Sequence, residues 1–154
     1  MKLLVVVDLS EATEKIVKKA EEIAKVLSAK VWLLHVAEPQ SDFVGLDVDP
    51  QVGLNADLQS VRDALAKGFH SEHFQIQKIA DRLHKAGLET TALLMQGATV
   101  ETILKEASKL DVDMIVVGSH GRGAMYQFLV GSVSEGVLHR SECPILVIPT
   151  HERT

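Results

Sequence analysis

Apolar residues occur along this chain in two patterns, as short continuous runs and as stripes at helical spacing. Five runs are rich in Val, Ile and Leu, and most do not alternate with polar residues: Leu3–Val7, Val31–Val36, Ala92–Met95, Met114–Val117 and Ile145–Ile148. Runs of this length and composition are typical of strands that are buried on both faces. They predict five strands of one sheet.

Between these runs, apolar residues recur every three or four positions, which predicts amphipathic helices. The first helix is expected to start after Ser10, a suitable cap. The others are expected to end at Gly87, to begin at a Thr99 cap, and to run from about Ser132 to Arg140. The stripes of the first three helices are Ile16, Ala20, Ile23, Ala24 and Leu27; Ile76, Ile79, Ala80 and Leu83; and Val100, Ile103, Leu104, Ala107 and Leu110.

The second stripe has an extension upstream. Leu58, Val61 and Leu65 keep its period, and Gly68 is the candidate interruption. The preceding stretch 37–56, AEPQSDFVGLDVDPQVGLNA, is acidic and rich in proline and glycine. A loop of this length inside a compact domain is either functional or disordered, and the sequence leaves the two open.

Strands that alternate with helices predict an α/β fold with a parallel sheet covered on both faces. The chain has 154 residues, enough for one domain with its own core. We therefore expect a single domain with an open parallel five-stranded sheet and helices on both faces, over residues 1–154. The apolar runs are far shorter than the roughly 20 residues that span a membrane, and the N-terminus is interpreted as a strand rather than a signal peptide.

The charge and the cysteine content narrow the function classes. The formal net charge of −5 argues against a nucleic-acid surface, although a small anionic ligand needs only local positive potential. One thiol, Cys143, cannot form an internal disulfide, which indicates a reducing compartment. Because Cys143 precedes the apolar run PILVI, it is expected to be a buried structural thiol. We expect a cytoplasmic protein without nucleic-acid or membrane partners.

The stretch VVGSHGRGAMYQFLVGSV, residues 116–133, holds the candidate chemistry. Ligands of open parallel sheets bind beyond the carboxyl ends of the strands, where the strand order reverses. If the first and fourth strands are neighbours there, Asp8 and Gly118 meet. A carboxylate can bond ribose or base, and glycines let backbone N–H groups close on phosphate oxygens. The helix that starts at Gly131–Ser132 points its positive end at such an anion, and Arg122 can add a charge-assisted contact.

Each of these residues also has a purely structural interpretation. Asp8 can cap the helix that follows it, and the loop glycines can be turn residues only. Ser132 and Glu135 form the S-x-x-E pattern of a capping box, which would compete with a phosphate for the same N–H groups. His120 is either an exposed loop residue or a phosphate contact. The residues alone leave these alternatives open.

The spacing of Gly118, two residues, Gly121, nine residues and then Gly131–Ser132 resembles the ATP-binding signature of the universal stress protein family. VVVDLSEATEKIVKKAEEIA is similar to the opening strand, aspartate and helix of that family, and VWLLHVAEP to its second strand. VDMIVVGSHGRG and GSVSEGVLHRSECPILVIP are similar to its fourth strand, loop, fourth helix and last strand. Two departures are Val7, where many members carry proline, and Gly136, where a larger residue is more usual.

The resemblance implies a Rossmann-like α/β sheet with strand order 3-2-1-4-5, a homodimer, and ATP, with or without Mg²⁺, between the first and fourth strands. It implies a small regulatory protein of the stress response whose protein partner the sequence does not identify. The contacts that it implies are Asp8 with the adenosine part, the Val36 backbone with adenine, Gly118 and Gly121 with ribose and phosphates, and Gly131, Ser132 and Val133 with the phosphates.

The last strand is expected at the edge of the sheet. Pairing residues 144–149 with their copy in a two-fold dimer would cover this apolar edge.

Two alternative functions stay open: a slow ATPase or phosphotransferase on the same site, and a nucleotide-free dimerisation module. Phosphoryl transfer needs a metal clamp and a positioned base or arginine. The sequence offers His120 and Arg122 for it, and no dedicated carboxylate for the metal.

The remaining candidates have simpler explanations. His35 is expected to be a satisfied histidine of the core or the cleft edge. His70 and His73 suit one helix face but lack a third ligand, so no metal site is expected. Asp47 and Asp49 lack the rest of a calcium loop. The aromatic residues expected in the core or an interface are Trp32, Phe69 and Phe74.

Overall fold

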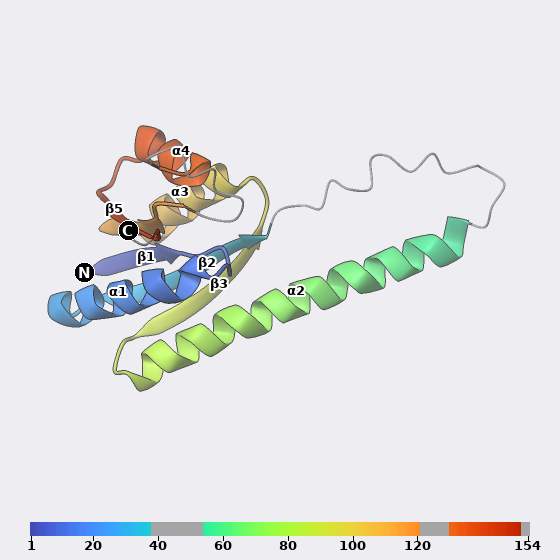
Figure 1. Cartoon of the computed structure of the whole chain (residues 1–154), viewed down its shortest axis with the longest axis horizontal. Helices are drawn as coiled ribbons and strands as arrows, with labels where there is room; N and C mark the ends of the chain where they lie inside the picture. The colour runs from blue at the N-terminus through green and yellow to red at the C-terminus, as the bar shows by residue number, and fades with distance from the viewer. Residues whose placement is uncertain (38–53, 121–129, 152–154) are drawn as a thin grey trace.

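The computed structural model describes residues 1–37, 54–120 and 130–151. Strands and helices alternate along these residues (Figure 1). The strands are β1 (Lys2–Val6), β2 (Lys30–Ala37), β3 (Thr90–Gln96), β4 (Met114–Gly118) and β5 (Ile145–Ile148). The helices are α1 (Ala12–Leu27), α2 (Leu54–Lys85), α3 (Thr99–Leu110) and α4 (Ser132–Arg140). All five predicted strands are confirmed.

The strands form one parallel sheet in the order β3-β2-β1-β4-β5, which confirms the predicted topology. Leu4 of the central strand lies opposite Trp32 of β2 and Ile115 of β4. From β1 the chain builds outward first through β2 and β3, and then through β4 and β5 on the other side. The strand order therefore reverses between β1 and β4, where ligands of such sheets bind.

Two apolar layers explain why the strand sequences do not alternate. Leu3 and Val5 of β1 face the core shared with α1 and α2, whereas Leu4 and Val6 face the core shared with α3 and α4. The two pairs of helices lie on opposite faces of the sheet (Figure 1). Since both faces of β1 are covered, consecutive residues of this strand are all apolar.

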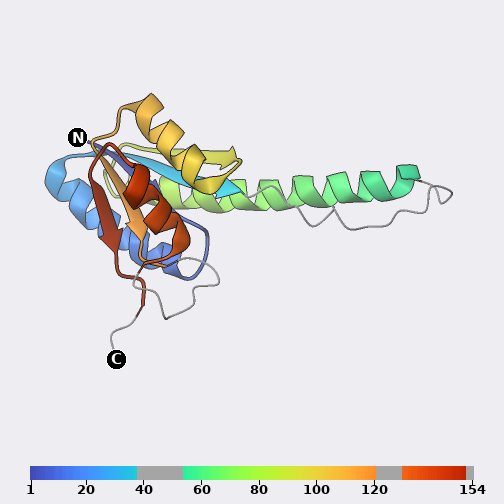
Figure 2. The same ribbon diagram turned by 90° about the horizontal axis from the view of Figure 1, so that it is seen from above.

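Helix α2 is longer than the sequence pattern predicts. It starts at Leu54, so the irregular stretch does not reach residue 56, and it continues through Gly68 without a break. One glycine costs a helix only about 1 kcal/mol, which the flanking turns can offset. Figure 2 shows the N-terminal part of α2 running well past the sheet. Phe69 and Phe74, expected in the core or an interface, are 40% and 69% exposed, so neither belongs to the core.

The helix ends correct two predicted N-caps and support two other predicted caps. Glu11, Ala98 and Gly131 occupy the N-cap positions of α1, α3 and α4, and none of these residues makes a side-chain cap hydrogen bond. Thr99 and Ser132 are therefore not the N-caps, and the proposed box of Ser132 with Glu135 does not form. Ser10 lies one residue before the N-cap position of α1, but its Oγ accepts a hydrogen bond from the N–H of Ala12, the first residue of the helix, as a capping side chain does. Gly87 has the expected left-handed conformation, with φ of 91°. Within the described residues, no helix has the length and apolar character needed to cross a membrane.

Candidate functional site

The carboxyl ends of β1 and β4 lie side by side at the reversal of the strand order. Val5 pairs with Val116 in parallel register, so the residues that leave the two strands do so at the same edge of the sheet. Asp8 follows β1 and Ser119 follows β4. The structure thus confirms the neighbourhood on which the predicted site depends.

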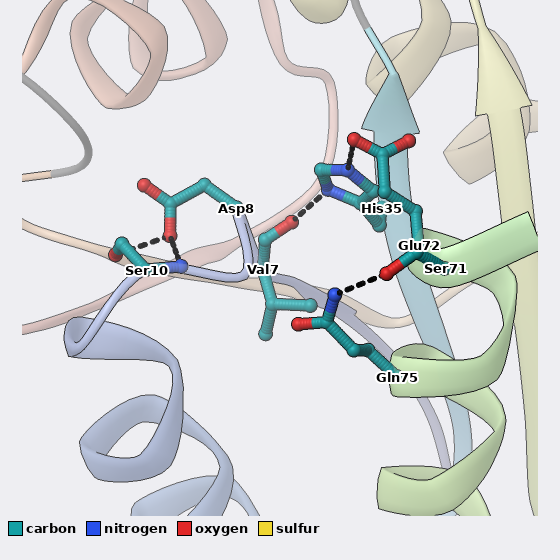
Figure 3. Close-up of polar contacts among 7 residues, drawn as sticks. All are labelled: Val7, Asp8, Ser10, His35, Ser71, Glu72 and Gln75. Carbon is teal, nitrogen blue, oxygen red and sulfur yellow. Dashed lines mark hydrogen bonds and ion pairs between the residues drawn. The ribbon is translucent and has the colours of Figure 1, made fainter. Parts of the chain in front are cut away.

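Asp8 organises the loop between β1 and α1. Its Oδ1 accepts hydrogen bonds from the Ser10 backbone N–H at 3.0 Å and from the Ser10 hydroxyl at 2.5 Å (Figure 3). The Ser10 Oγ in turn accepts a bond from the Ala12 N–H at 3.3 Å. In these bonds Asp8 fixes the loop, and Ser10 is the residue that reaches the first turn of α1. The adenosine contact of Asp8 remains a prediction.

The residue after Asp8 has an unusual backbone. Leu9 has φ of 58°, in the left-handed region that costs a non-glycine residue about 1–2 kcal/mol. In the described residues, the other non-glycine residues with positive φ are Ser28 and Asp111, and both are helix C-caps. Leu9 has no helix end to account for it. Strained backbone of this kind clusters at ligand sites, which favours the β1 end as a functional loop.

Val36 is the next-to-last residue of β2 and is 6% exposed. Its side chain belongs to the core shared with α3 and α4, and it pairs with Met95 of β3. A ligand at this position would therefore have to use the backbone, as the resemblance implies. The contact with adenine stays a prediction.

Gly118 ends β4 in a crowded position. A Cβ atom there would lie 2.6 Å from Ile16 Cδ1 and 2.9 Å from Thr150 Cγ2. A larger residue here would displace the side chains of Ile16 in α1 and Thr150 after β5, so their close approach favours glycine at this position. Packing explains this glycine as well as a ribose contact does.

A polar network links the end of β4 to the chain after β5. Ser119 is 4% exposed, and its Oγ lies 3.0 Å from His120 Nδ1 and 3.2 Å from Thr150 Oγ1. The Thr150 N–H donates to Ser119 Oγ at 3.0 Å, and the His120 N–H donates to Thr150 Oγ1 at 3.2 Å. His120 is half-buried and packs edge-on against His151, so the interpretation of His120 as an exposed loop residue is wrong. Sequence reasoning missed Ser119 and Thr150, because hydroxyl residues beside strand ends have no distinctive pattern.

The start of α4 is held against the end of β4. The Gly131 N–H donates to the Ser119 carbonyl at 2.5 Å, and the Ser134 hydroxyl donates to the Gly118 carbonyl at 2.5 Å. The N–H groups in the first turn of a helix have no acceptor within that helix. Those of Ser132 and Val133, the first two residues of α4, are of this kind. With the positive end of the helix dipole, they make the start of α4 suitable for an anion.

Several predicted residues lie outside the described part of the chain. These are Gly121 and Arg122 in the loop after β4, and Asp47 and Asp49 in the stretch after β2.

His70 and His73 are exposed on α2. In residues 1–37, 54–120 and 130–151, no three His, Cys, Asp or Glu side chains gather in a group that could hold a metal ion. Cys143 is half-buried rather than fully buried, and its Sγ lies 3.5 Å from Ser141 Oγ.

Known proteins share both the sequence pattern and this fold. The model of the universal stress protein family matches residues 1–149. The chain belongs to the universal stress protein family. Universal stress protein MJ0577 of Methanocaldococcus jannaschii is 29% identical over 152 residues, covering 96% of this chain and 93% of MJ0577. The solved structure of MJ0577 has a TM-score of 0.78 at 25% identity, covering 99% of this chain and 97% of that chain.

Two universal stress proteins with the same fold were solved with nucleotides. One, in complex with cAMP, has a TM-score of 0.69 and 22% identity over 98% of both chains. The other, from Archaeoglobus fulgidus in complex with dAMP, has a TM-score of 0.60 and 19% identity, covering 96% of this chain and 97% of that chain. At these identities the similarity shows the shared fold. The family resemblance inferred from the glycine spacing is thus confirmed by the family match.

Proposed function

We propose that this universal stress protein is a cytoplasmic regulator that binds an adenine nucleotide, ATP in the first place, between the ends of β1 and β4. The observation that carries the proposal is the start of α4, where no side chain caps the helix. It is held against the end of β4, at the edge of the sheet where Asp8 leaves β1. The complexes of two similarly folded family members with cAMP and dAMP support an adenine nucleotide as the ligand.

The phosphates are expected at the N–H groups of Ser132 and Val133. Ser132 is exposed, so its hydroxyl can also turn to a phosphate oxygen. The Gly131 N–H already donates to the Ser119 carbonyl, so a phosphate contact through this group requires that bond to open. Gly121 and Arg122 are proposed to close on the phosphates from the loop. Mg²⁺ accompanying ATP would take most of its ligands from phosphate oxygens and water.

The rest of the nucleotide is expected along the sheet edge. Asp8 is proposed to bond the ribose or base, Val36 to meet adenine through its backbone, and Gly118 to line the ribose. The carboxylate oxygen of Asp8 that binds Ser10 is already fixed in position by the loop. A group whose orientation is set before binding loses less entropy when the ligand arrives.

The first test is to identify what the protein carries. The protein is purified without added nucleotide, denatured, and its released small molecules are analysed by chromatography with mass detection. Titration calorimetry with ATP, with and without Mg²⁺, then gives the affinity. Saturable binding is expected. Absence of binding at millimolar ATP would contradict the proposal and favour a nucleotide-free dimerisation module, and ADP formed in a single turnover would favour an ATPase.

A substitution tests where the phosphates lie. Gly131 has φ of −72° and ψ of 159°, an extended conformation that valine adopts readily. Gly131→Val should therefore preserve the fold while its side chain obstructs the phosphates. Loss of charge-assisted bonds predicts an ATP affinity weaker by about 10- to 100-fold. Gly68→Ala, on the exposed part of α2, is the matched control and should keep the wild-type affinity. An unchanged affinity in Gly131→Val would show that the phosphates lie elsewhere.

We also propose a homodimer formed through residues 144–149. The carbonyls of Pro144 and Ile148 accept hydrogen bonds from Ile115 of β4 and from Ser119, the residue after β4. The backbone N–H and C=O groups of Ile145 and Val147 therefore point to the outer side of this edge strand. A groove of about 660 Å³ runs beside the strand. It is lined by apolar Leu146 and Ile148 and by lysines of α1. An open apolar edge of this kind is a template for strand pairing.

Removal of one outward N–H tests the dimer. Val147→Pro deletes this donor and keeps the bonds to β4, a change that edge strands tolerate. Val147→Ala is the control, because it removes more of the side chain than Val147→Pro does but keeps the backbone N–H. We expect light scattering to find a dimer in the wild type and in Val147→Ala, and a monomer in Val147→Pro. A dimer in all three proteins would contradict pairing through this strand.

A further inference from the structure

His35 joins the ends of two strands directly behind the proposed nucleotide site. It precedes Val36 at the carboxyl end of β2, and its side chain is buried. Its Nδ1 lies 2.9 Å from the carbonyl oxygen of Val7, the residue before Asp8 (Figure 3). A carbonyl only accepts hydrogen bonds, so Nδ1 carries the hydrogen and donates it. One imidazole therefore spaces the two residues, Asp8 and Val36, that are proposed to contact the adenosine.

In the neutral imidazole, no hydrogen-bond donor of the described residues faces the second ring nitrogen, Nε2. With the hydrogen on Nδ1, Nε2 is an acceptor, and it is buried without a hydrogen-bond partner. The atom that faces it is Glu72 Oε1 of α2, at 3.6 Å, which is also an acceptor (Figure 3). Protonation of the ring changes this contact, because Nε2 then carries a hydrogen and the ring a positive charge, which makes the contact at 3.6 Å an ion pair. A small approach of the two side chains converts the ion pair into a charge-assisted hydrogen bond, which is stronger than a neutral one.

The other groups around the ring do not offer a competing partner. In the loop after β1, the carboxylate of Asp8 is turned toward Ser10, away from the imidazole (Figure 3). On β3, the residue in register with His35 is the apolar Leu94. On α2, Glu72 is the charged group that faces the ring, and the neighbouring Ser71 accepts a hydrogen bond from Gln75. Among the described residues, Glu72 is thus the group that responds to the charge of His35.

We propose that His35 is a positioning residue of the nucleotide site, and that its protonation ties α2 to the strand ends through Glu72 and raises nucleotide affinity. This inference rests on the proposed nucleotide function. In the neutral state His35 holds only the Val7 carbonyl. In the protonated state it holds Val7 and Glu72 together, so Asp8 and Val36 are fixed more firmly before the nucleotide binds.

The direction of the pH effect follows from the charges. The charge of a histidine changes between about pH 5 and 8. The bond from the protonated ring to Glu72 is therefore expected on the acid side of this range and is lost on the basic side. Coupling between two sites commonly changes affinity by 5- to 150-fold. We expect the low end, about fivefold tighter binding at pH 6 than at pH 8.

The test compares three full-length proteins by calorimetry with ATP at pH 6 and pH 8. Glu72→Gln removes the charge of the partner, and His35→Gln keeps a donor for Val7 but cannot titrate. Because ATP itself gains a proton in this range, each affinity is divided by that of His35→Gln at the same pH. The ratio should rise about fivefold from pH 8 to pH 6 in the wild type and stay flat in Glu72→Gln. The same ratio in both proteins at both pH values would overturn the proposal.

A control pair and a second readout separate this inference from the proposed function. His139 and Glu135 lie 3.7 Å apart on the exposed surface of α4, and Glu135→Gln should retain the wild-type pH dependence. NMR follows the resonances of the His35 ring at pH 6 and pH 8 without nucleotide, and the change between the two pH values should differ between the wild type and Glu72→Gln. An identical change in both proteins would overturn the coupling even if ATP binds. A different change in a protein that binds no ATP would refute the nucleotide function, and with it the positioning role, while leaving the ion pair established.

Discussion

The outer half of α2 and the pair formed by α3 and α4 each contain a helical glycine, and the two glycines have opposite surroundings. In the outer half of α2, every described side chain from Gln59 to Ser71 is exposed, and a Cβ added at Gly68 would meet nothing within 4 Å. In α4, a Cβ added at Gly136 would lie 2.8 Å from Val100 Cγ2 of α3. The same residue type thus marks a helix without neighbours in one region and a close helix–helix contact in the other.

This difference shows what a sequence pattern leaves undecided. Glycine weakens any helix by about 1 kcal/mol relative to alanine, because it adds backbone freedom to the unfolded chain. At Gly136 the missing side chain allows α4 to approach Val100 closely, and this contact offsets the lower helix propensity of glycine. At Gly68 no contact with the described residues offsets the lower propensity. Changing each glycine to alanine should therefore have opposite effects on stability.

The largest effect is expected for Gly136→Ala. The valine against which the new methyl group presses is short and stiff, so the two helices must move apart. Overpacking of this kind costs about 1–3 kcal/mol and outweighs the gain in helix propensity. We expect a net loss of about 1 kcal/mol in the free energy of unfolding by urea denaturation.

A double-mutant cycle identifies the cause of that loss. Val100→Ala removes the methyl group that lies 2.8 Å from the new Cβ. In this background, Gly136→Ala should be neutral or stabilising, since only the helix propensity remains. A loss of equal size in both backgrounds would mean that the contact between α3 and α4 does not explain this glycine.

Gly68→Ala should have a smaller effect of the opposite sign. The position lies inside a continuous helix and has open space around it. Alanine should gain at most about 1 kcal/mol. Because the outer half of α2 has few neighbours, the gain should appear as slower amide exchange in residues 62–71 and only partly as global stability. Faster exchange in the variant would show that the helix needs glycine at this position.

The same contrast explains how far the sequence predicts the fold. The strands were found correctly because runs such as Leu3–Val7 are buried on both faces and need no other information. The length and exposure of α2 were not predicted correctly, because Leu65 keeps the spacing of a buried apolar stripe and yet is 41% exposed. A period of 3.6 residues predicts a helix with an apolar face, and it does not state what covers that face.

The candidate site divides in the same way. The sequence predicts correctly that Asp8 and Gly118 lie at the same edge of the sheet, because neighbouring parallel strands end at the same edge. The contact of His35 with Glu72 was not foreseen, since it depends on how a distant helix is rotated against the sheet. The crowding of Gly118 by Ile16 was missed for the same reason. Residues joined by the chain or by the strand register can be placed from sequence, whereas contacts between layers require the structure.

The smallest effect concerns the polar contact that joins α3 and α4 at the surface. A hydrogen bond from Arg140 lowers the pKa of the Glu101 carboxyl below its ordinary value of 4.5. A pKa that is lower in the folded than in the unfolded state gives stability above the unfolded value, and this stability is lost as the pH falls through the folded value. Arg140→Ala should raise the pKa of Glu101 toward 4.5 in an NMR titration, with little change in stability at neutral pH because both side chains are exposed. Glu22 of α1, whose pKa is lowered by Lys19, is the control and should not respond. An unmoved pKa of Glu101 would show that the hydrogen bond from Arg140 is not formed in solution.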